Sequence, residues 1–244
     1  MTGKIHSIET CGTVDGPGMR YAIFLQGCPL RCIYCHNPDT WPEKSKTAKE
    51  MTVDELMKDV VKYKSYFKFS GGGLTISGGE PLMQKEFCAE LFKACQKEGI
   101  HTALDTSGCY KIDDIIADVL AHTDLVLLDI KSIDPSTFKG VTGVKIENTL
   151  AFARYLSDNN IPAWVRFVQV PGHTDNPEEI HALAKYVTTL KNLQKLSVLP
   201  FHQLGAYKWS EMGLEYKLAG VKEPTPQEAE DLRDLFRGYG LEVI

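Results

Sequence analysis

The sequence predicts an α/β fold, a partial parallel (β/α)6 barrel of the TIM type. Short runs rich in β-branched and aromatic residues alternate with longer helical patterns about six times along the chain. Several of these short runs are apolar throughout, as a sheet that is covered on both faces requires. Polar or glycine-rich motifs follow most of them, and such barrels carry their functional site at the carboxyl ends of the strands.

The expected elements follow one another as strand and helix. Strands are expected at residues 21–27, 73–78, 100–105, 125–130, 163–170, 195–200 and 241–244. Helices are expected at residues 51–67, 84–98, 111–121, 145–160, 176–191 and 225–239. The first helix is the clearest, because Thr52 and Glu55 form a capping-box pattern ahead of an apolar face.

One domain is expected over residues 1–244, with residues 1–20 and 201–244 as extensions of the barrel. Two stretches interrupt the alternation, a polar loop at 37–51 and a long excursion with glycine and proline at 204–226. Long loops in compact domains often carry function, so both stretches are candidate lids or partner surfaces.

Composition and charge exclude several classes of function. The formal net charge is −5 at pH 7, so the sequence lacks the basic footprint of a nucleic-acid-binding protein. No apolar run reaches the roughly 18 residues of a membrane span, and the first residues lack the apolar stretch of a secretory signal. Because no large apolar patch is readable either, we expect a cytoplasmic monomer with no membrane or nucleic-acid partner.

Three of the seven cysteines, Cys28, Cys32 and Cys35, form one cluster with the spacing C-x3-C-x2-C. Thiols at this spacing suit a soft metal or a redox role. Zinc is one interpretation, with His36 as a fourth ligand, but His36 directly follows Cys35 and shared coordination is awkward. A four-iron cluster is the other, and three thiolates leave one iron open to a ligand. The other cysteines are expected to be small buried residues or free thiols: Cys11, Cys88, Cys95 and Cys109.

The stretch CPLRCIYC at 28–35 resembles the signature of the radical S-adenosylmethionine (radical SAM) enzymes, including the aromatic Tyr34 before the last cysteine. The resemblance implies a barrel of the radical SAM type and one [4Fe–4S] cluster held by Cys28, Cys32 and Cys35. It also implies that S-adenosylmethionine binds the fourth iron, beside Tyr34 and Cys35. One electron from the cluster then splits this cofactor into methionine and a 5′-deoxyadenosyl radical, which abstracts hydrogen from a substrate.

The glycine-rich motif SGGEP at 77–81 is similar to the motif that binds the cofactor's ammonium group in this family. The resemblance therefore assigns Gly78, Gly79 and Glu80 to the cofactor site. Glycines let a ligand approach the backbone without a Cβ in the way. Taken alone, the motif is also consistent with a plain turn between a strand and a helix.

The motif LLDIK at 127–131 puts Asp129 and Lys131 on one face of a strand, because side chains alternate along a strand. The resemblance implies that Asp129, Ile130 and Lys131 line the cofactor site, whereas a surface ion pair is the plainer interpretation. Arg166 lies in an apolar strand, where a charge needs a partner. That partner is either the cofactor carboxylate, the substrate backbone or a structural acidic residue.

Further polar residues are expected to face the same cavity. His36 and Asn37 follow the cysteine motif, and His202 follows the sixth strand, where contact with the adenosine part of the cofactor is expected although a lone histidine is more often structural.

Asp105 and Thr106 end the strand next to the one that carries Asp129. Two neighbouring carboxylates repel each other, so a cation between them is expected. The resemblance implies that this cation is monovalent, Na⁺ or K⁺, and that it also contacts the cofactor carboxylate.

Longer motifs extend the resemblance over essentially the whole chain and indicate the glycyl-radical-enzyme activating enzymes within the radical SAM enzymes. These motifs are TVDGPG, YCHNPDTW, SGGGLTISGGEPLMQ, LDTSG, LVLLDIK, VPGHTD and KLSVLPFHQLGAYKW. No cysteine lies between Cys35 and Cys88, so the additional ferredoxin-like segment of some activating enzymes is absent and one cluster is expected.

The resemblance implies hydrogen abstraction from one glycine Cα of a protein partner, pyruvate formate-lyase, which leaves a stable backbone radical. Asp15, among the glycines of TVDGPG, and Asn37 are expected to bind the glycine loop of the partner, although Asp15 also suits an ordinary turn. A flavodoxin or a ferredoxin is the expected electron donor. The alternatives are another glycyl-radical partner, a small-molecule substrate such as that of a carboxydeazaguanine-synthase-like enzyme, and a non-catalytic zinc-binding α/β protein.

Overall fold

The computed structural model describes residues 1–244 as two compact units. The first unit consists of Met1–Pro29, Thr40–Thr106 and Tyr110–Leu127. The second consists of Leu30–Asp39, Ser107–Cys109 and Leu128–Ile244. The single domain that the sequence predicts over 1–244 stays a prediction.

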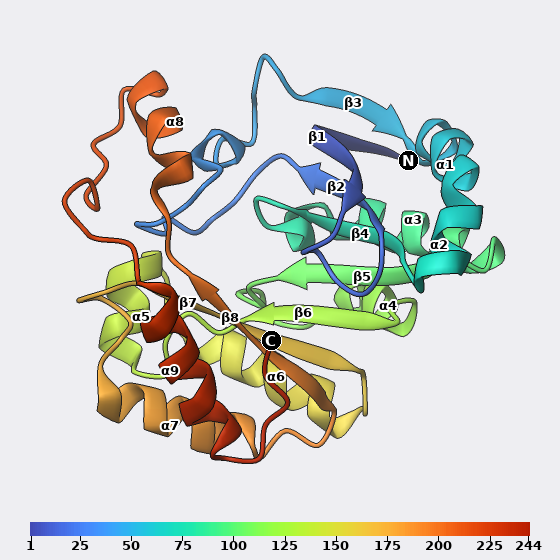
Figure 1. Ribbon diagram of the computed structural model, residues 1–244. Coiled ribbons are helices and arrows are strands. Elements are labelled where there is room, and N and C mark those ends of the chain that lie inside the picture. The colour runs from blue at the N-terminus through green and yellow to red at the C-terminus, as the bar shows by residue number, and fades with distance from the viewer. The chain divides into compact units, whose positions relative to one another are not determined.

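The strands form one open sheet in the order β3-β1-β2-β4-β5-β6-β7-β8 (Figure 1). Their bounds are β1 Thr2–Gly12, β2 Arg20–Leu25, β3 Lys49–Thr52, β4 Gly73–Gly78, β5 His101–Thr106, β6 Leu125–Asp129, β7 Ala163–Gln169 and β8 Leu193–Pro200. The pairs β2–β4, β4–β5 and β7–β8 are parallel, whereas β1 pairs antiparallel with both β2 and β3. The predicted α/β class with a mainly parallel, incomplete barrel sheet is therefore confirmed.

Helices follow the strands as the alternation predicts. The first unit holds α1 Val53–Val60, α2 Lys64–Ser70, α3 Lys85–Lys97 and α4 Asp114–Ala121. The second holds α5 Pro135–Thr142, α6 Glu147–Asp158, α7 Pro177–Val187, α8 Ala206–Glu211 and α9 Pro226–Arg237. Short 3₁₀ turns lie at Pro38–Thr40, Val61–Tyr63, Pro81–Gln84 and Gln203–Gly205. At the start of α1, Thr52 and Glu55 make both hydrogen bonds of the predicted capping box.

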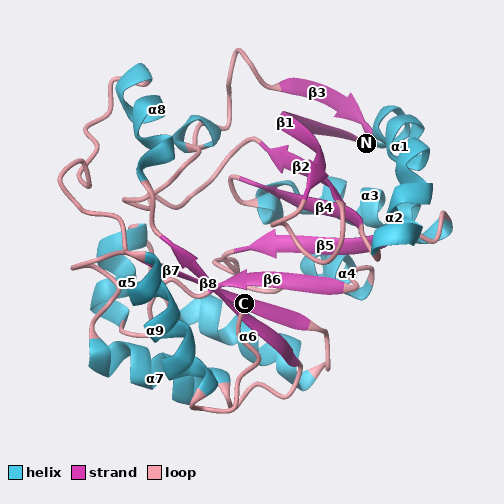
Figure 2. Cartoon of the chain, viewed as in Figure 1, coloured by secondary structure: helices cyan, strands magenta, loops and turns pink.

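The core of the first unit lies between its parallel strands and its helices. Ile76 of β4 aligns with Ile23 of β2 and with Leu104 of β5, and all three side chains are fully buried. Helices α3 and α4 lie along one face of these strands (Figure 2), and α3 buries Phe92 and Cys95 completely. These strands are apolar throughout because the sheet is covered here, as the sequence indicated.

In the second unit, burial alternates along β7, and the ring of Phe167 packs against Phe236 of α9 with a centroid distance of 6.1 Å. The outer edge of β8 is covered by the last residues of the chain. The Leu196 amide donates to the Glu242 carbonyl at 2.8 Å, and the Val198 amide donates to the Ile244 carbonyl at 3.0 Å. This cover satisfies backbone groups that an edge strand would otherwise leave to solvent.

Several predicted boundaries are wrong. The predicted helix at 51–67 is two helices separated by the turn at Val61–Tyr63, and the predicted strand at 241–244 is only an isolated bridge between Leu196 and Val243. The strands β1 and β3 lie in stretches that were expected to be an extension and a polar loop. Both strands expose many of their residues, so neither has the apolar run that reveals a buried strand.

Two helices were also not predicted, α5 and α8. Helix α5 has a clear start signal, because the Asp134 side chain accepts hydrogen bonds from the amides of Ser136 and Thr137 and Pro135 is its first residue. Helix α8 lies in the excursion at 204–226. None of the helices combines the length and the apolar composition that a membrane span requires.

Candidate functional site

The cysteine motif begins directly after β2. Cys28 belongs to the first unit, where its amide donates to the Trp41 carbonyl at 3.2 Å, and Cys32 and Cys35 belong to the second unit. The Cys35 amide donates to the Cys32 carbonyl at 3.0 Å, which closes a tight turn between the two thiols. None of the seven cysteines forms a disulfide, and Cys88 and Cys95 are buried as expected. Within neither unit does a group of three histidine, cysteine or acidic side chains already form a metal site.

In the second unit, the middle of the motif packs against Lys131. The Lys131 ammonium lies 5.6 Å from the centre of the Tyr34 ring, a cation–π distance. Burial raises the pKa of the Cys32 thiol to about 12, and the nearby Lys131 charge acts in the opposite direction. The Tyr34 hydroxyl is buried and has no hydrogen-bond partner. The stretch between Cys32 and Cys35 therefore contains an unsatisfied polar group.

A buried group of charges follows β6. The Lys131 ammonium lies 2.9 Å from Asp129 Oδ2, and Arg166 Nε lies 3.7 Å from Asp129 Oδ1. The side chain of Lys131 is only 10% exposed, so the interpretation as a surface ion pair is wrong. Although burial works against both charged forms, the opposite charge of each partner prevails, so the pKa of Asp129 is lowered and that of Lys131 is raised.

The same group connects two strands through the backbone, because the amide of the buried Ile130 donates to the Arg166 carbonyl at 3.1 Å. Asp129, Lys131 and Arg166 together carry one negative and two positive charges. This arrangement can attract an anionic group such as a carboxylate.

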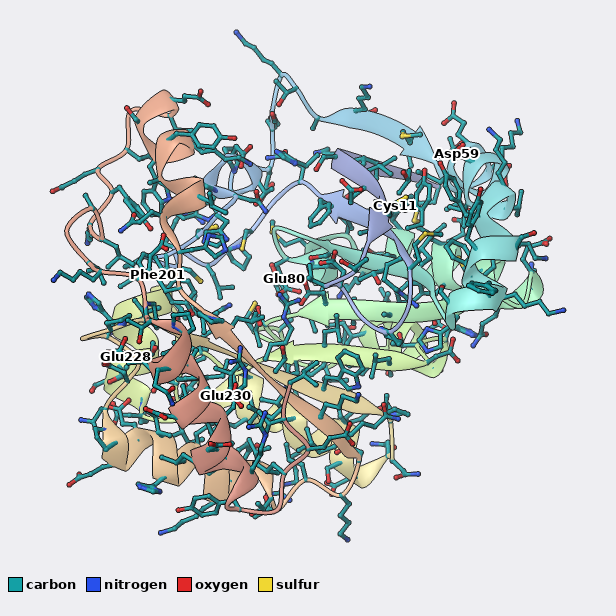
Figure 3. All side chains as sticks on the ribbon, in the orientation of Figure 1. Cys11, Asp59, Glu80, Phe201, Glu228 and Glu230 are labelled. Carbon is teal, nitrogen blue, oxygen red and sulfur yellow. The ribbon has the colours of Figure 1, made fainter.

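In the first unit, Glu80 lies beyond the carboxyl end of β4 (Figure 3), and its side chain is 1% exposed. Its Oε1 accepts hydrogen bonds from the Thr106 hydroxyl at 2.6 Å and from the Leu82 amide at 3.2 Å. A Cβ added to Gly79 would lie 2.1 Å from the Gly27 carbonyl oxygen and 3.1 Å from Cys28 Cβ. Glycine is therefore required where SGGEP approaches the start of the cysteine motif.

Gly78 and Asp105 complete this part of the first unit. The backbone of Gly78 has a φ of 119°, and a Cβ there would lie 2.1 Å from the Leu25 amide nitrogen. The Ser77 hydroxyl donates to Asp105 Oδ2 at 2.7 Å, so both Asp105 and Glu80 are acidic groups with hydroxyl partners at the strand ends. These carboxylates suit an ammonium group or a small cation.

Asp15 is buried in the loop between β1 and β2. Its carbonyl accepts a hydrogen bond from the Thr75 hydroxyl at 2.7 Å, and Thr75 in turn accepts from Arg20 Nε at 2.8 Å. Arg20 is fully buried and is a structural residue that the sequence analysis did not single out. A charged residue at the first position of an apolar strand was its only signal.

The segment after Cys35 lies against residues 202–209 in the second unit. His36 Nε2 lies 3.1 Å from the His202 carbonyl, and the two imidazole rings lie 4.0 Å apart. Burial, followed by the charge of His202, lowers the pKa of His36. The His202 Nδ1 is buried without a partner. Asn37 accepts a hydrogen bond at Oδ1 from the Lys208 ammonium at 2.8 Å.

Lys208 and Trp209 were missed as individual residues, although the motif that contains them contributed to the resemblance. Their signal was their position in the excursion at 204–226, which was singled out as a possible functional stretch.

Sequence comparison gives one family and many close relatives. The model of the Radical SAM superfamily matches residues 22–186 of the chain. The pyruvate formate-lyase 1-activating enzyme of Escherichia coli K12 is 46% identical over 243 residues, which cover 99% of this chain and 98% of that protein. The pyruvate formate-lyase-activating enzyme of Staphylococcus aureus USA300 is 47% identical over 229 residues, 92% of this chain and 91% of that protein.

Solved structures of the same fold agree with the sheet described above. A domain of pyruvate-formate lyase-activating enzyme from Bacteroides vulgatus superposes with a TM-score of 0.60 at 24% identity, covering 71% of this chain and 98% of that chain. Streptococcus suis SuiB bound to its precursor peptide SuiA superposes with a TM-score of 0.69 at 18% identity, covering 98% of this chain and 49% of that chain. At these identities the structural likeness supports the fold alone.

Proposed function

The chain belongs to the radical SAM superfamily and, within it, to the pyruvate formate-lyase-activating enzymes, and on this premise we propose that it makes a radical at one glycine of a pyruvate formate-lyase. The observation that carries the proposal is 46% identity to an activating enzyme over 99% of this chain. The interpretation as a non-catalytic zinc-binding protein does not agree with this family membership.

The residues of the cysteine motif fit a [4Fe–4S] cluster by their chemistry. Cys28, Cys32 and Cys35 form no disulfide, and thiolates are the ligands that iron–sulfur clusters take. Gly79 supports this assignment, because the absence of its Cβ allows the backbone of SGGEP to approach Cys28 closely. When bound, the cluster supplies the electron that splits S-adenosylmethionine into methionine and a 5′-deoxyadenosyl radical.

Within each unit, the charges suit one end of the amino-acid part of S-adenosylmethionine. In the first unit, the Glu80 carboxylate suits the ammonium, and Gly78 and Gly79 contribute backbone carbonyls. In the second unit, Lys131 and Arg166 outweigh the charge of Asp129 and suit the carboxylate. The motifs and the charges found within each unit support this assignment of the ammonium and the carboxylate.

Four further side chains are assigned to the remainder of the cofactor. Tyr34 and His202 each bury a polar atom that has no partner in the protein, and such atoms are costly unless a ligand satisfies them. They are assigned with Ile130 and His36 to the adenosine part and its surroundings.

A monovalent cation, Na⁺ or K⁺, at Asp105, Thr106 and Asp129 is part of the proposal. Replacement of small monovalent cations by a large organic cation should then lower cofactor cleavage. Unchanged cleavage in the presence of the organic cation would contradict a bound Na⁺ or K⁺ at these residues.

The partner's glycine segment is assigned to Asp15 and Asn37. Replacement Asp15→Ala should lower activation of the partner more than cleavage of S-adenosylmethionine in the absence of the partner. Equal losses of both activities would count against a substrate role for Asp15. A flavodoxin or ferredoxin as electron donor, a monomeric state and a cytoplasmic location stay predictions of the sequence.

The decisive experiment uses anaerobic protein with a reconstituted cluster, S-adenosylmethionine, a one-electron reductant and a purified pyruvate formate-lyase. Electron paramagnetic resonance should detect an organic radical on the partner. Replacement of the reacting glycine by alanine in the partner should abolish the signal while 5′-deoxyadenosine is still formed. Cofactor cleavage with no radical on the wild-type partner would leave the chain a radical SAM enzyme with a different substrate.

A further inference from the structure

The four residues Cys35, His36, Asn37 and Asp39 are each held by the segment His202–Trp209, which we call the clasp. The second half of the clasp is the beginning of the short helix α8, which starts at Ala206 (Figure 1). The clasp follows β8 and lies far from the cysteine motif in the sequence. All of these residues belong to the second unit.

Trp209 fixes the peptide group of Cys35. The Trp209 side chain is 6% exposed, and its indole N–H donates to the Cys35 carbonyl at 2.9 Å. Tyr216 packs against the same indole with a centroid distance of 5.2 Å, which restricts its rotation. Since the Cys35 amide already donates to Cys32, both backbone polar groups of Cys35 are engaged, and the direction of its Cα–Cβ bond is fixed from both sides.

Lys208 fixes the next two polar side chains. Its ammonium donates to Asn37 Oδ1 at 2.8 Å and lies 3.1 and 3.3 Å from the two carboxylate oxygens of Asp39. An ammonium carries three donors, so one lysine can hold both residues at once. The side chain of Lys208 is 20% exposed, which strengthens these charge-assisted bonds relative to a surface pair.

Gly205 makes the close approach of the clasp possible. A Cβ at this position would lie 2.6 Å from His36 Cα, closer than packed carbon atoms approach. The imidazole rings of His36 and His202 then lie 4.0 Å apart, and His36 Nε2 lies 3.1 Å from the His202 carbonyl.

We propose that Trp209 and Lys208 are positioning residues, Trp209 for the third cysteine ligand and Lys208 for the substrate-facing Asn37. The inference deepens the proposed function, on which the roles of Cys35 and Asn37 rest. The two residues have different roles. The Trp209 indole holds the backbone of Cys35, a proposed cluster ligand, whereas the Lys208 ammonium holds the side chain of Asn37, which is assigned to binding the partner. Residues that bind a cofactor or a substrate are generally held in position by hydrogen bonds from residues behind them.

The test uses Trp209→Phe, which removes the N–H donor and keeps an aromatic ring, and Lys208→Met, which removes the charge and keeps the stem. Lys208→Arg restores donors and charge. Lys217→Met, at an exposed position of the same excursion, is the matched control. Amide hydrogen exchange over residues 35–39 of the cluster-free protein reports directly on the clasp. Each of the first two variants should exchange about five- to tenfold faster there, the factor for loss of about one hydrogen bond.

The loaded protein provides the readouts that a merely structural role would not move. Trp209→Phe should change the g-values of the reduced cluster at an unchanged iron content. Lys208→Met should raise the KM for a peptide of the partner's glycine segment about tenfold, with little change in partner-independent cofactor cleavage, and Lys208→Arg should recover most of the loss.

Unchanged exchange over 35–39 together with unchanged g-values and KM would overturn the inference. The same effects in Lys217→Met would overturn it too, since they would then be a general response of the excursion. A wild-type protein that makes no radical on its partner would defeat the proposed function instead, while hydrogen exchange and the g-values would still decide the role of the clasp.

Discussion

Each unit buries a charged centre, and the two centres are built on different principles. In the first unit, the Arg20 guanidinium is held by neutral groups: it donates to the Thr75 hydroxyl, to the carbonyls of Leu74 and His101, and to His101 Nδ1. In the second unit, Asp129 is held by two cations, Lys131 and Arg166.

The pKa values show the consequence of this difference. Burial lowers the pKa of Arg20 to about 10, and the charges of Asp124 and Asp15 only partly oppose it. Burial is also the largest influence at Lys131, but there the Asp129 charge reverses its effect and raises the pKa. A centre built on neutral acceptors is structural and self-contained, whereas the Asp129 centre carries excess positive charge that suits an anionic ligand.

The largest effect on stability is expected from Asp129→Asn. This change leaves two cations at the site without the carboxylate between them, and breaking a buried pair costs about 3–5 kcal/mol. A loss near about 3 kcal/mol is expected, because the Asp129 side chain keeps 21% exposure. Urea unfolding of the cluster-free protein measures it. Asp129→Asn combined with Lys131→Met should recover part of the loss. A loss below about 1 kcal/mol for Asp129→Asn alone would mean that the Asp129 centre does not differ in this way from the Arg20 centre.

A smaller loss is expected from Arg20→Met. The change leaves neutral acceptors at Thr75, Leu74 and His101 without their donor, but it also removes a buried charge. An unsatisfied buried group costs about 1–3 kcal/mol, so the net loss should stay within that range. Arg20→Lys should not restore stability, because an ammonium lacks the planar fork of the guanidinium. A loss larger than that of Asp129→Asn would reverse the comparison.

The Arg20 centre should also make stability depend on pH through His101. Burial, and then the Arg20 charge, lowers the pKa of His101 below its usual 6.5, against the smaller opposing influence of Asp124. The unfolded chain therefore binds a proton first as the pH falls. The stabilisation is complete above pH 6.5 and is lost as the pH falls from there through the lowered pKa. In His101→Gln, the decrease of unfolding free energy between pH 7.5 and 5.5 should be smaller than in the unaltered protein, and an identical decrease would contradict this account.

The smallest effect on stability is expected from Tyr34→Phe in the cofactor-free protein. The hydroxyl of Tyr34 is buried without a partner, so its removal should be neutral or slightly stabilising, within about 1 kcal/mol. Calorimetry of S-adenosylmethionine binding to the cluster-loaded variant then shows whether the ligand satisfies that hydroxyl. A large loss of stability in the cofactor-free variant would mean that the protein itself uses the group.

The sequence predicted the parts of the fold in which local pattern and final environment agree. The bounds of the buried strands β4, β5 and β6 were predicted within one residue. A strand that is covered on both faces needs apolar side chains throughout, so its apolar run marks its bounds in the sequence. The strand β1, which lies between β3 and β2, was missed because many of its side chains are exposed and polar, as in a loop.

The assigned site residues stay predictions, and they differ in what the sequence offers for them. Cys28, Cys32 and Cys35 are singled out by residue type and spacing, whereas Glu80 was assigned through the family resemblance, because SGGEP alone also suits a plain turn. The clasp was not predictable, because Trp209 and Lys208 act on residues far away in the sequence, and no local pattern reports which carbonyl an indole will contact. Alternation did place Asp129 and Lys131 together, but only the structure showed that they are buried and that Arg166 joins them.

The pairing of residues 242–244 with β8 has a practical consequence for handling the protein. These few residues occupy the amides of Leu196 and Val198 and the carbonyl of Leu196, which would otherwise be able to pair with a strand of a neighbouring molecule. Their deletion would leave the edge of β8 unpaired, and we expect self-association that grows with protein concentration as the result.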